Sequence, residues 1–313
     1  MKHWADFLLR AGVVALSLAI ILARFARYDW RFELLSHWQI HYGLAVILLL
    51  VMCLARRRYA LASVAILAAC LNGIFIDTAS VVAASSSARG QDTARLRVVS
   101  ANILYDNKDY NAALNWLHSA EPDLAVLVEV TPEWIAAMAP LQRRLPHTIT
   151  VPRKKGQGLA LYSKFRLDEP TVLEFGEHRR VAIAASLTIS DRKVTIVAAH
   201  PFPPGHHGRT HERDAYLREL AAFLRSLNGP IVLAGDLNTT PWSYSFQDLV
   251  QSLERPAKIL PATWPSFLGS FGIPIDHLLG REVRIQSLRT GPYIGSDHLP
   301  LIGEVILYSA LRP

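Results

Sequence analysis

Cysteine is scarce in this chain of 313 residues, which contains only Cys53 and Cys70. Both cysteines lie within apolar stretches of the first 84 residues, so the rest of the chain can form no internal disulfide bond. A disulfide framework is therefore excluded there, and an oxidising compartment is allowed but not indicated. The sequence also lacks internal repeats, and low complexity is confined to the segment AASSSARGQDTA at residues 83–94.

Apolar residues are abundant instead: they make up 51% of the sequence, and the excess is concentrated in the first 84 residues. Three apolar stretches occur there, namely Phe7–Ala23, Trp38–Ala55 and Leu61–Ala84. Each approaches the roughly 17–25 residues that a transmembrane helix needs. A signal peptide would explain only the first, and long core helices are the alternative for the first two, which lack a polar face. We therefore predict three membrane spans in residues 1–84. The third is the least regular, because the polar residues Asn72 and Asp77 lie within it.

The distribution of Lys and Arg over the short loops predicts the orientation of these spans. In a three-span layout, five basic residues lie on the side of the N-terminus: Lys2, Arg10, Arg56, Arg57 and Arg58. Three lie on the other side: Arg24, Arg27 and Arg31. Because basic residues are enriched in cytoplasmic loops, we expect a multi-pass protein of the cytoplasmic membrane whose C-terminal domain is extracytoplasmic.

Residues 85–94 are small and polar, and they predict a linker between the membrane region and a domain at residues 95–313 that folds on its own. More than half of the net charge of +7 belongs to residues 1–94, which carry nine Lys/Arg and five Asp/Glu. Residues 95–313 carry 24 Lys/Arg and 21 Asp/Glu, so this domain is only mildly basic. Its clusters Arg143–Arg144 and Arg153–Lys155 are interpreted as solvated loop faces rather than phosphate contacts.

Apolar runs with the length of β-strands recur through residues 95–313 and are interleaved with a few helical segments. The predicted helices are Asn111–Ser119 and Thr210–Leu227. The predicted strands are Leu96–Ile103, Leu124–Val130, Gly158–Tyr162, Val181–Ile189, Val194–Ala199, Ile231–Ala234, Pro274–Leu279 and Leu299–Leu307. This pattern indicates an α/β fold in which two packed sheets are flanked by helices.

Polar residues end or follow several predicted strands, where a rigid strand end can present them to a substrate. Asp236 and Asn238 follow the run Pro230–Ala234 and, on extended backbone, point the same way. They could orient a water and hold a phosphate oxygen, and a plain Asx turn is the alternative. Glu129 lies in an apolar strand, where an unpartnered carboxylate is costly. It therefore needs a cation such as Mg²⁺ or an ion pair with an arginine.

Five further polar residues have comparable positions. Asn102 follows the first strand, and taken alone it could equally well be a helix or turn cap. His200 follows another strand, and a lone histidine there is more often structural than catalytic. Asp297 and His298 belong to the segment GSDH before the last strand, where the glycine permits a bend that turns both toward one site. Asp276 lies between apolar neighbours, where an aspartate commonly fixes the tautomer of a histidine.

The ordered set of Asn, Glu, His, Asp-x-Asn, Asp and Ser-Asp-His resembles the endonuclease/exonuclease/phosphatase superfamily. The resemblance covers about residues 95–310, and GDLN at 235–238 with SDH at 296–298 are its most specific motifs. It implies a four-layered α/β sandwich of two mostly antiparallel sheets flanked by helices, and hydrolysis of phosphate esters with Mg²⁺ or Mn²⁺. Glu129 matches the principal metal ligand, Asn102 lies beside that site, and Asp297 matches an accessory carboxylate.

The resemblance also implies roles for the remaining residues. Asp236 would orient or activate the attacking water, and Asn238 would hold a phosphate oxygen. His298 would be a second acid/base or phosphate-contacting group, with Asp276 hydrogen-bonded to it. His200 matches a histidine of the deoxyribonuclease and sphingomyelinase branches, in a region where abasic-site nucleases have a tyrosine.

Several substrate classes are compatible with the sequence. The family's commonest activity favours a nuclease, whereas the membrane region and the weak charge favour a phospholipid or small organophosphate. A catalytically silent binding domain of the same fold is a third hypothesis. No insertion that would grip a DNA groove is evident. The segment PPGHHGRTHERD at 203–214 has no assigned role, although it carries His206, His207, Arg209, His211 and Arg213.

Overall fold

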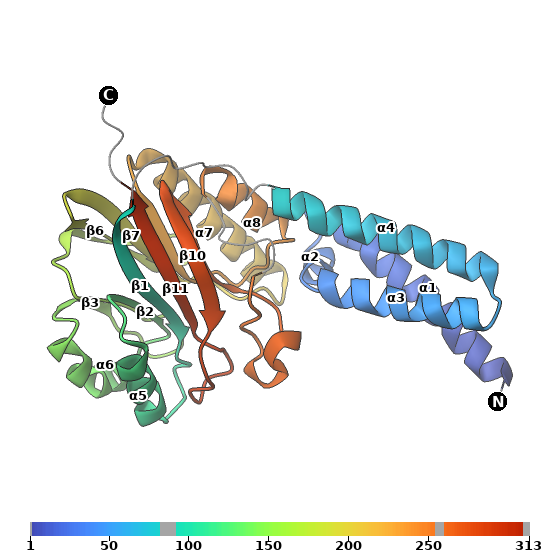
Figure 1. The fold of residues 1–313 in the computed structure, drawn as a ribbon, viewed down its shortest axis with the longest axis horizontal. Coiled ribbons are helices and arrows are strands. Elements are labelled where there is room, and N and C mark those ends of the chain that lie inside the picture. The colour runs from blue at the N-terminus through green and yellow to red at the C-terminus, as the bar shows by residue number, and fades with distance from the viewer. Residues whose placement is uncertain (1, 82–91, 254–259, 309–313) are drawn as a thin grey trace.

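The N-terminal part of the molecule is a rod of three helices, seen in a computed structural model that describes residues 2–81, 92–253 and 260–308 (Figure 1). Helices α1 (Lys2–Leu22), α3 (Gln39–Ala55) and α4 (Tyr59–Val81) pack side by side. The short helices η1 (Ala23–Phe25) and α2 (Trp30–Ser36) connect α1 to α3 where the rod meets the C-terminal part. The N-terminus lies at the far end of the rod.

Length and composition indicate which of these helices can cross a membrane. Two are long and apolar enough, His3–Phe25 and Tyr59–Ile76. The pair α2 and α3 adds a third only if this pair, bent by 69°, is counted as one span. The described part of the chain thus has two or three candidate spans, where the sequence predicted three. Asn72, which interrupts the third stretch, is buried, and its Nδ2 donates to the Gln39 carbonyl oxygen at 2.9 Å.

The C-terminal part contains two mixed β-sheets. The first has the order β10-β11-β1-β2-β4-β3 and the second the order β5-β6-β7-β8-β9. Only β1 with β2 and β7 with β8 pair in parallel; the other neighbours are antiparallel. The strands of the first sheet are β1 (Asp92–Asn102), β2 (Leu124–Val128), β3 (His147–Val151), β4 (Leu159–Ser163), β10 (Val283–Thr290) and β11 (Leu301–Tyr308). Those of the second are β5 (Asp168–Phe175), β6 (Arg180–Ile189), β7 (Arg192–Ala199), β8 (Ile231–Asp236) and β9 (Asp276–Arg281).

Helices cover the outer face of each sheet and make the four layers of an α/β sandwich (Figure 1). The first sheet is covered by α5 (Tyr110–Ala120), α6 (Pro132–Ala137) and η2 (Ala139–Arg143). The second is covered by α7 (His207–Ser226), α8 (Tyr244–Leu249) and η3 (Val250–Ser252). A further 3₁₀ segment, η4 (Ser266–Phe271), lies in the loop before β9. The predicted fold class is confirmed.

The period-two alternation of β1 shows why the sequence makes this sandwich. Leu96 and Val98 point into the core between the sheets, whereas Val99 and Ala101 point into the core under α5 and α6. A strand with both faces buried is apolar over most of its buried length, as Leu96–Ala101 is apart from Arg97 and Ser100. At about 25 cal/mol per Å² of buried apolar area, the two cores hold β1 firmly, and Asn102 at its end is held in place with it.

Three strands lie outside the predicted set: β3, β5 and β10. Both β5 and β10 expose many residues at sheet edges, so they lack the continuous apolar runs on which the prediction depended. Residues 85–91 of the predicted linker (85–94) lie outside the described residues, and its last three residues belong to β1, which begins at Asp92.

A buried ion pair attaches α2 to the C-terminal part. Arg213 Nη2, on α7, lies 2.8 Å from Glu33 Oε1, and both side chains are fully buried. The Ser243 hydroxyl donates to the same carboxylate oxygen at 2.6 Å, and Arg213 also pairs with Asp214 at 2.6 Å. Because buried charges are tolerated only when they are paired, this pair fixes α2 against α7. The N-terminal helical part and the C-terminal domain therefore share a buried contact.

We predict that Glu33→Gln destabilises the full chain in detergent by about 3 kcal/mol, the lower end for breaking a buried ion pair, because Arg213 keeps Asp214. The matched control is Arg27→Gln, which removes the half-exposed Arg27–Asp248 pair at 2.7 Å; it should cost about 0–1 kcal/mol. Thermal and denaturant unfolding measure both. Equal losses in the two variants would contradict the structural role of the buried pair.

Candidate active site

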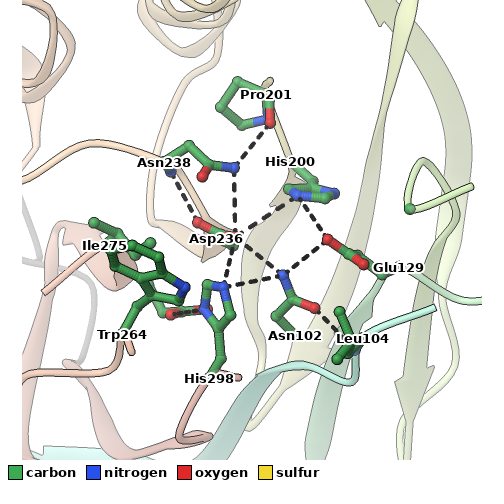
Figure 2. Close-up of polar contacts among 12 residues, drawn as sticks. Asn102, Leu104, Glu129, His200, Pro201, Asp236, Asn238, Trp264, Ile275 and His298 are labelled. Carbon is green, nitrogen blue, oxygen red and sulfur yellow. Dashed lines mark hydrogen bonds and ion pairs between the residues drawn. The ribbon is translucent and has the colours of Figure 1, made fainter. Parts of the chain in front are cut away.

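The predicted site residues meet at one edge of the two sheets, where four strands end (Figure 2). Asn102 is the last residue of β1, and Glu129 directly follows β2. His200 directly follows β7, and Asp236 is the last residue of β8. Since β1 and β2 run parallel, as do β7 and β8, each sheet delivers two of these side chains at the same edge.

Asp236 lies at the centre of the group (Figure 2). Its Oδ2 accepts from Asn102 Nδ2 at 3.1 Å, and its Oδ1 accepts from the backbone N–H of Asn238 at 2.9 Å. The Nε2 atoms of His200 and His298 each lie 3.7 Å from Oδ2. Burial raises the pKa of the Asp236 carboxyl, and the positive charge of His298 opposes this shift. A buried carboxylate with a raised pKa can hold or release a proton near neutral pH.

Two of the predicted residues are not on extended backbone. Glu129 follows β2 with φ of 66°, and Asn238 has φ of 50°; both are left-handed conformations. The predictions that Glu129 lies inside its strand, and that Asp236 and Asn238 point the same way along a strand, are therefore wrong. The chain turns at both points, as asparagine tolerates and glutamate rarely adopts. These turns bring Glu129 Oε1 within 3.2 Å of Asn102 Nδ2.

Asp276 and His298 form a short hydrogen-bonded pair. Asp276, the first residue of β9, lies opposite Asp236 in the sheet register, and its Oδ2 lies 2.7 Å from His298 Nδ1. Burial alone would lower the pKa of the His298 imidazole, but the charges of Asp276 and Asp236 outweigh it and raise this pKa to about 10. His298 is therefore protonated, with one N–H on Asp276 and the other toward Asp236.

His200 has the opposite protonation. Its Nδ1 lies 3.2 Å from Arg180 Nη2, and since a guanidinium can only donate, Nδ1 is the acceptor and Nε2 carries the proton. Burial, then the charges of Arg180 and His298, lower the pKa of His200 well below its usual value. The neutral ring thus presents an N–H between Glu129 Oε1, at 3.9 Å, and Asp236 Oδ2.

Glu129 has the environment of a cation ligand. Its carboxylate accepts from Asn102 Nδ2 and from the backbone N–H of Tyr105, and among the described residues no Lys or Arg pairs with it. Burial and the charge of Asp297 raise the pKa of this carboxyl. The arginine ion pair that the sequence left open is therefore absent from the described residues, and these oxygen donors fit a hard divalent cation.

The side chains of Asp297 and His298 point in different directions, because the backbone bends at Gly295 just before them. Gly295 has φ of 86°, and a Cβ there would lie 2.6 Å from Asn107 Oδ1, so glycine suits this turn. His298 is buried toward Asp236, whereas Asp297 is exposed on the pocket wall and accepts from Trp264 Nε1 at 3.1 Å. Asp297 is thus near the site but outside the hydrogen-bonded group.

Asp236, Asp276 and His298 also satisfy the spacing of a metal site, with one ligand atom from each within 4.8 Å of the others. Both carboxylates are already paired with His298, however, at 2.7 Å for Asp276 and 3.7 Å for Asp236. We therefore interpret these three residues as a proton-holding group and Glu129 as the better cation ligand.

The site opens into a cavity of about 810 Å³. Its lining includes residues that the sequence gave no reason to select. Arg180, at the start of β6, is buried beside His200 and stacks on Phe202 at 4.3 Å; its only sequence signal is a charge at the head of an apolar run. Other unpredicted lining residues include Leu34, His37, Trp38, Arg209 and Trp264. Lys155, which the sequence assigned to a solvated loop face, also lines the cavity.

The His-rich segment before and within α7 is explained in part by structure. His206 caps α7 by accepting from the Arg209 backbone N–H at 3.4 Å. Arg213 forms the buried pair with Glu33, and Arg209 lines the cavity. His207 and His211 stack at 6.5 Å outside the active site.

Comparison with known proteins agrees with this geometry. Residues 99–298, more than half of the chain, match the Endonuclease/Exonuclease/phosphatase family, to which the chain therefore belongs. Members of this family are hydrolases of phosphoester bonds that typically use a divalent metal.

Relatives by sequence are matched only in part. A UPF0294 protein of Photorhabdus laumondii is 33% identical over 97 residues, which are 28% of this chain and 35% of the relative. A UPF0294 protein of Vibrio parahaemolyticus is 32% identical over 98 residues, which are 30% of this chain and 34% of the relative. The matches thus span about a third of the length of these relatives.

Solved structures show the same fold at low identity. A humanized TDP2 from D. rerio has a TM-score of 0.57 at 14% identity, over 68% of this chain and 99% of that one. Sphingomyelinase C from Streptomyces griseocarneus has a TM-score of 0.52 at 16% identity, over 69% and 100%. The human nocturnin catalytic domain has a TM-score of 0.51 at 18% identity, over 69% and 96%.

We predict that His298→Ala lowers kcat on the soluble diester bis-p-nitrophenyl phosphate by about 10²–10⁴-fold, the contribution of a general acid or base. Asp276→Asn should lose less, because its amide oxygen still accepts from Nδ1 but no longer balances the charge. His118→Ala, at an exposed site on α5, is the control. A larger loss in Asp276→Asn than in His298→Ala would contradict the assignment of Asp276 as a positioning residue.

Proposed function

We propose that this protein is a divalent-metal-dependent phosphodiesterase tethered to a membrane by its N-terminal helices. The observation that carries the proposal is the buried Asp236, which faces a protonated His298 and a neutral His200 at 3.7 Å on the wall of an open cavity. One carboxylate that can accept a proton beside one imidazolium that can give a proton suits hydrolysis.

Glu129, with Asn102 beside it and Asp297 as an accessory carboxylate, would hold Mg²⁺ or Mn²⁺. Such a cation neutralises charge on the non-bridging phosphate oxygens and so favours the transition state of phosphoryl transfer. The Glu129 carboxylate supports this assignment, because its oxygens are hard ligands with no Lys or Arg partner among the described residues. Asn102 donates from Nδ2 to this carboxylate and accepts from the Leu104 backbone N–H with Oδ1, so it positions Glu129 in this structure.

The remaining residues supply positioning and proton transfer. Asp236 orients the attacking water and takes its proton, and the Asn102 and Asn238 contacts hold this carboxylate in place. His298 gives a proton to the leaving oxygen. The Nε2–H of His200 faces a non-bridging oxygen, where a fixed donor acts without reorganisation. The Asn238 side-chain amide donates to the Pro201 carbonyl oxygen at 3.1 Å and to Asp236 Oδ2 at 3.4 Å, so Asn238 helps to position Asp236. A catalytically silent binding domain is disfavoured, because the chain has a residue of the catalytic type at every position where the family resemblance requires one.

We predict that Asp236→Asn lowers hydrolysis of bis-p-nitrophenyl phosphate by about 10²–10⁴-fold, since an amide cannot take the proton of water. EDTA should abolish the wild-type activity and added Mg²⁺ or Mn²⁺ should restore it. Asp191→Asn, at an exposed turn with φ of 63° that asparagine tolerates, is the matched control. Wild-type rates in Asp236→Asn, or full activity in EDTA, would refute the proposed function.

We further predict that the catalytic domain is extracytoplasmic, because Arg56–Arg58 lie at the end of the rod opposite to the domain and mark the cytoplasmic side. Alkaline phosphatase fused after Gly90 should be active, and green fluorescent protein fused there should be dark. The reverse result would place the domain in the cytoplasm and leave the proposed chemistry untouched.

A further inference from the structure

One wall of the catalytic cavity comes from the membrane region. Leu34, His37 and Trp38, in and just after α2, line the same cavity as Asp236 and His298. More than 190 residues separate these two groups in the sequence, so their meeting is a property of the folded molecule. The cavity that receives the substrate is therefore incomplete without the segment that joins α1 to α3.

Polar contacts with separate parts of the catalytic domain hold this wall in place. Arg213 pairs with Glu33 one residue before Leu34. His37 Nδ1 lies 3.0 Å from the Thr240 hydroxyl, and both groups are buried. His41 Nε2 lies 2.7 Å from the carbonyl oxygen of Phe271. These contacts at positions 33, 37 and 41 fix one face of the segment against the domain.

The same wall adjoins the apolar helices. Trp38 immediately precedes Gln39, where α3 begins, and a helix rises only about 1.5 Å per residue. α3 is almost entirely apolar, and Leu44, Ile47 and Leu48 are exposed on it. If α3 enters a bilayer, Trp38 lies at the interface, where tryptophan is enriched.

The catalytic domain also has exposed aromatic residues at this level. Phe267 is 83% exposed and Phe271 is 68% exposed, both on η4. The His41 contact to the Phe271 carbonyl places η4 beside the start of α3. Aromatic side chains held in water next to an apolar helix are suited to insertion into the interfacial layer of a bilayer.

We infer that the substrate is a membrane lipid that carries a phosphate ester in its headgroup. The inference rests on the proposed function and names the substrate class of the same site. The phosphate reaches Asp236 and His298 from the membrane side, and Leu34 and Trp38 contact the apolar part of the lipid. Lys155 and Arg209, which also line the cavity, supply positive charge for the headgroup.

The reaction is a hydrolysis in which all atoms are accounted for. The oxygen of water bonds to phosphorus, and its proton goes to Asp236. The P–O bond to one alcohol breaks, and that alcohol leaves with the proton of His298. Proton transfer from Asp236 to His298, which lie 3.7 Å apart, restores both groups.

The test uses the full chain with Mg²⁺, reconstituted in vesicles of phosphatidylethanolamine, phosphatidylglycerol and phosphatidic acid. Mass spectrometry measures lipid products, and bis-p-nitrophenyl phosphate and a single-stranded oligonucleotide are assayed in parallel. We expect lipid hydrolysis by the wild type. The double variant Leu34→Ala/Trp38→Ala should lose about tenfold more activity on lipid than on the soluble diester, the effect expected when an apolar anchor is removed.

Phe267→Ser/Phe271→Ser should also lower lipid hydrolysis, whereas Tyr293→Ser, a 67%-exposed aromatic away from the cavity lining, should not. Hydrolysis of the soluble diester or the oligonucleotide without any lipid product overturns the lipid substrate and leaves the proposed function standing. Equal losses on lipid and diester in the Leu34/Trp38 variant also overturn it. If the protein hydrolyses none of these substrates in the presence of the metal, the proposed function is overturned, and the lipid inference falls with it.

Discussion

The burial of several carboxylates around one imidazolium is the constraint on which the site depends. Asp236 and Asp276 face each other across β8 and β9, and His298 lies between them with a nitrogen toward each. Burying either carboxylate without a partner would cost free energy of folding. The negative charges of the two carboxylates together keep His298 protonated. Glu129 has no such cationic partner among the described residues. The division between a proton-holding pair and a cation ligand follows from this difference in partners.

Much of this arrangement could be predicted from the sequence, because it depends on strand ends. Asn102 and Asp236 end strands that are buried on both faces, and apolar runs reveal such strands directly. The local backbone was less predictable: Glu129 and Asn238 have positive φ, which no apolar pattern encodes. Arg180 was missed because its role depends on His200, 20 residues away on the neighbouring strand.

The attachment of the N-terminal helices to the C-terminal domain could not be predicted for a related reason. Glu33 and Arg213 are 180 residues apart, and each alone looks like an ordinary surface charge in a helix. Only their burial against each other shows that α2 belongs to the catalytic cavity as much as to the helical rod. The N-terminal helices are therefore attached to the C-terminal domain by a buried ion pair and contribute to the cavity wall.

We propose that Glu129, rather than the Asp236–Asp276–His298 group, holds the cation. Titration of the full chain in detergent with Mn²⁺, followed by electron paramagnetic resonance, tests it most directly. We expect a bound ion in the wild type and in His298→Ala, and greatly weakened binding in Glu129→Gln, which keeps the shape of the side chain but removes its charge. Binding that survives in Glu129→Gln and is lost in His298→Ala would show that the cation is held by the Asp236–Asp276–His298 group instead.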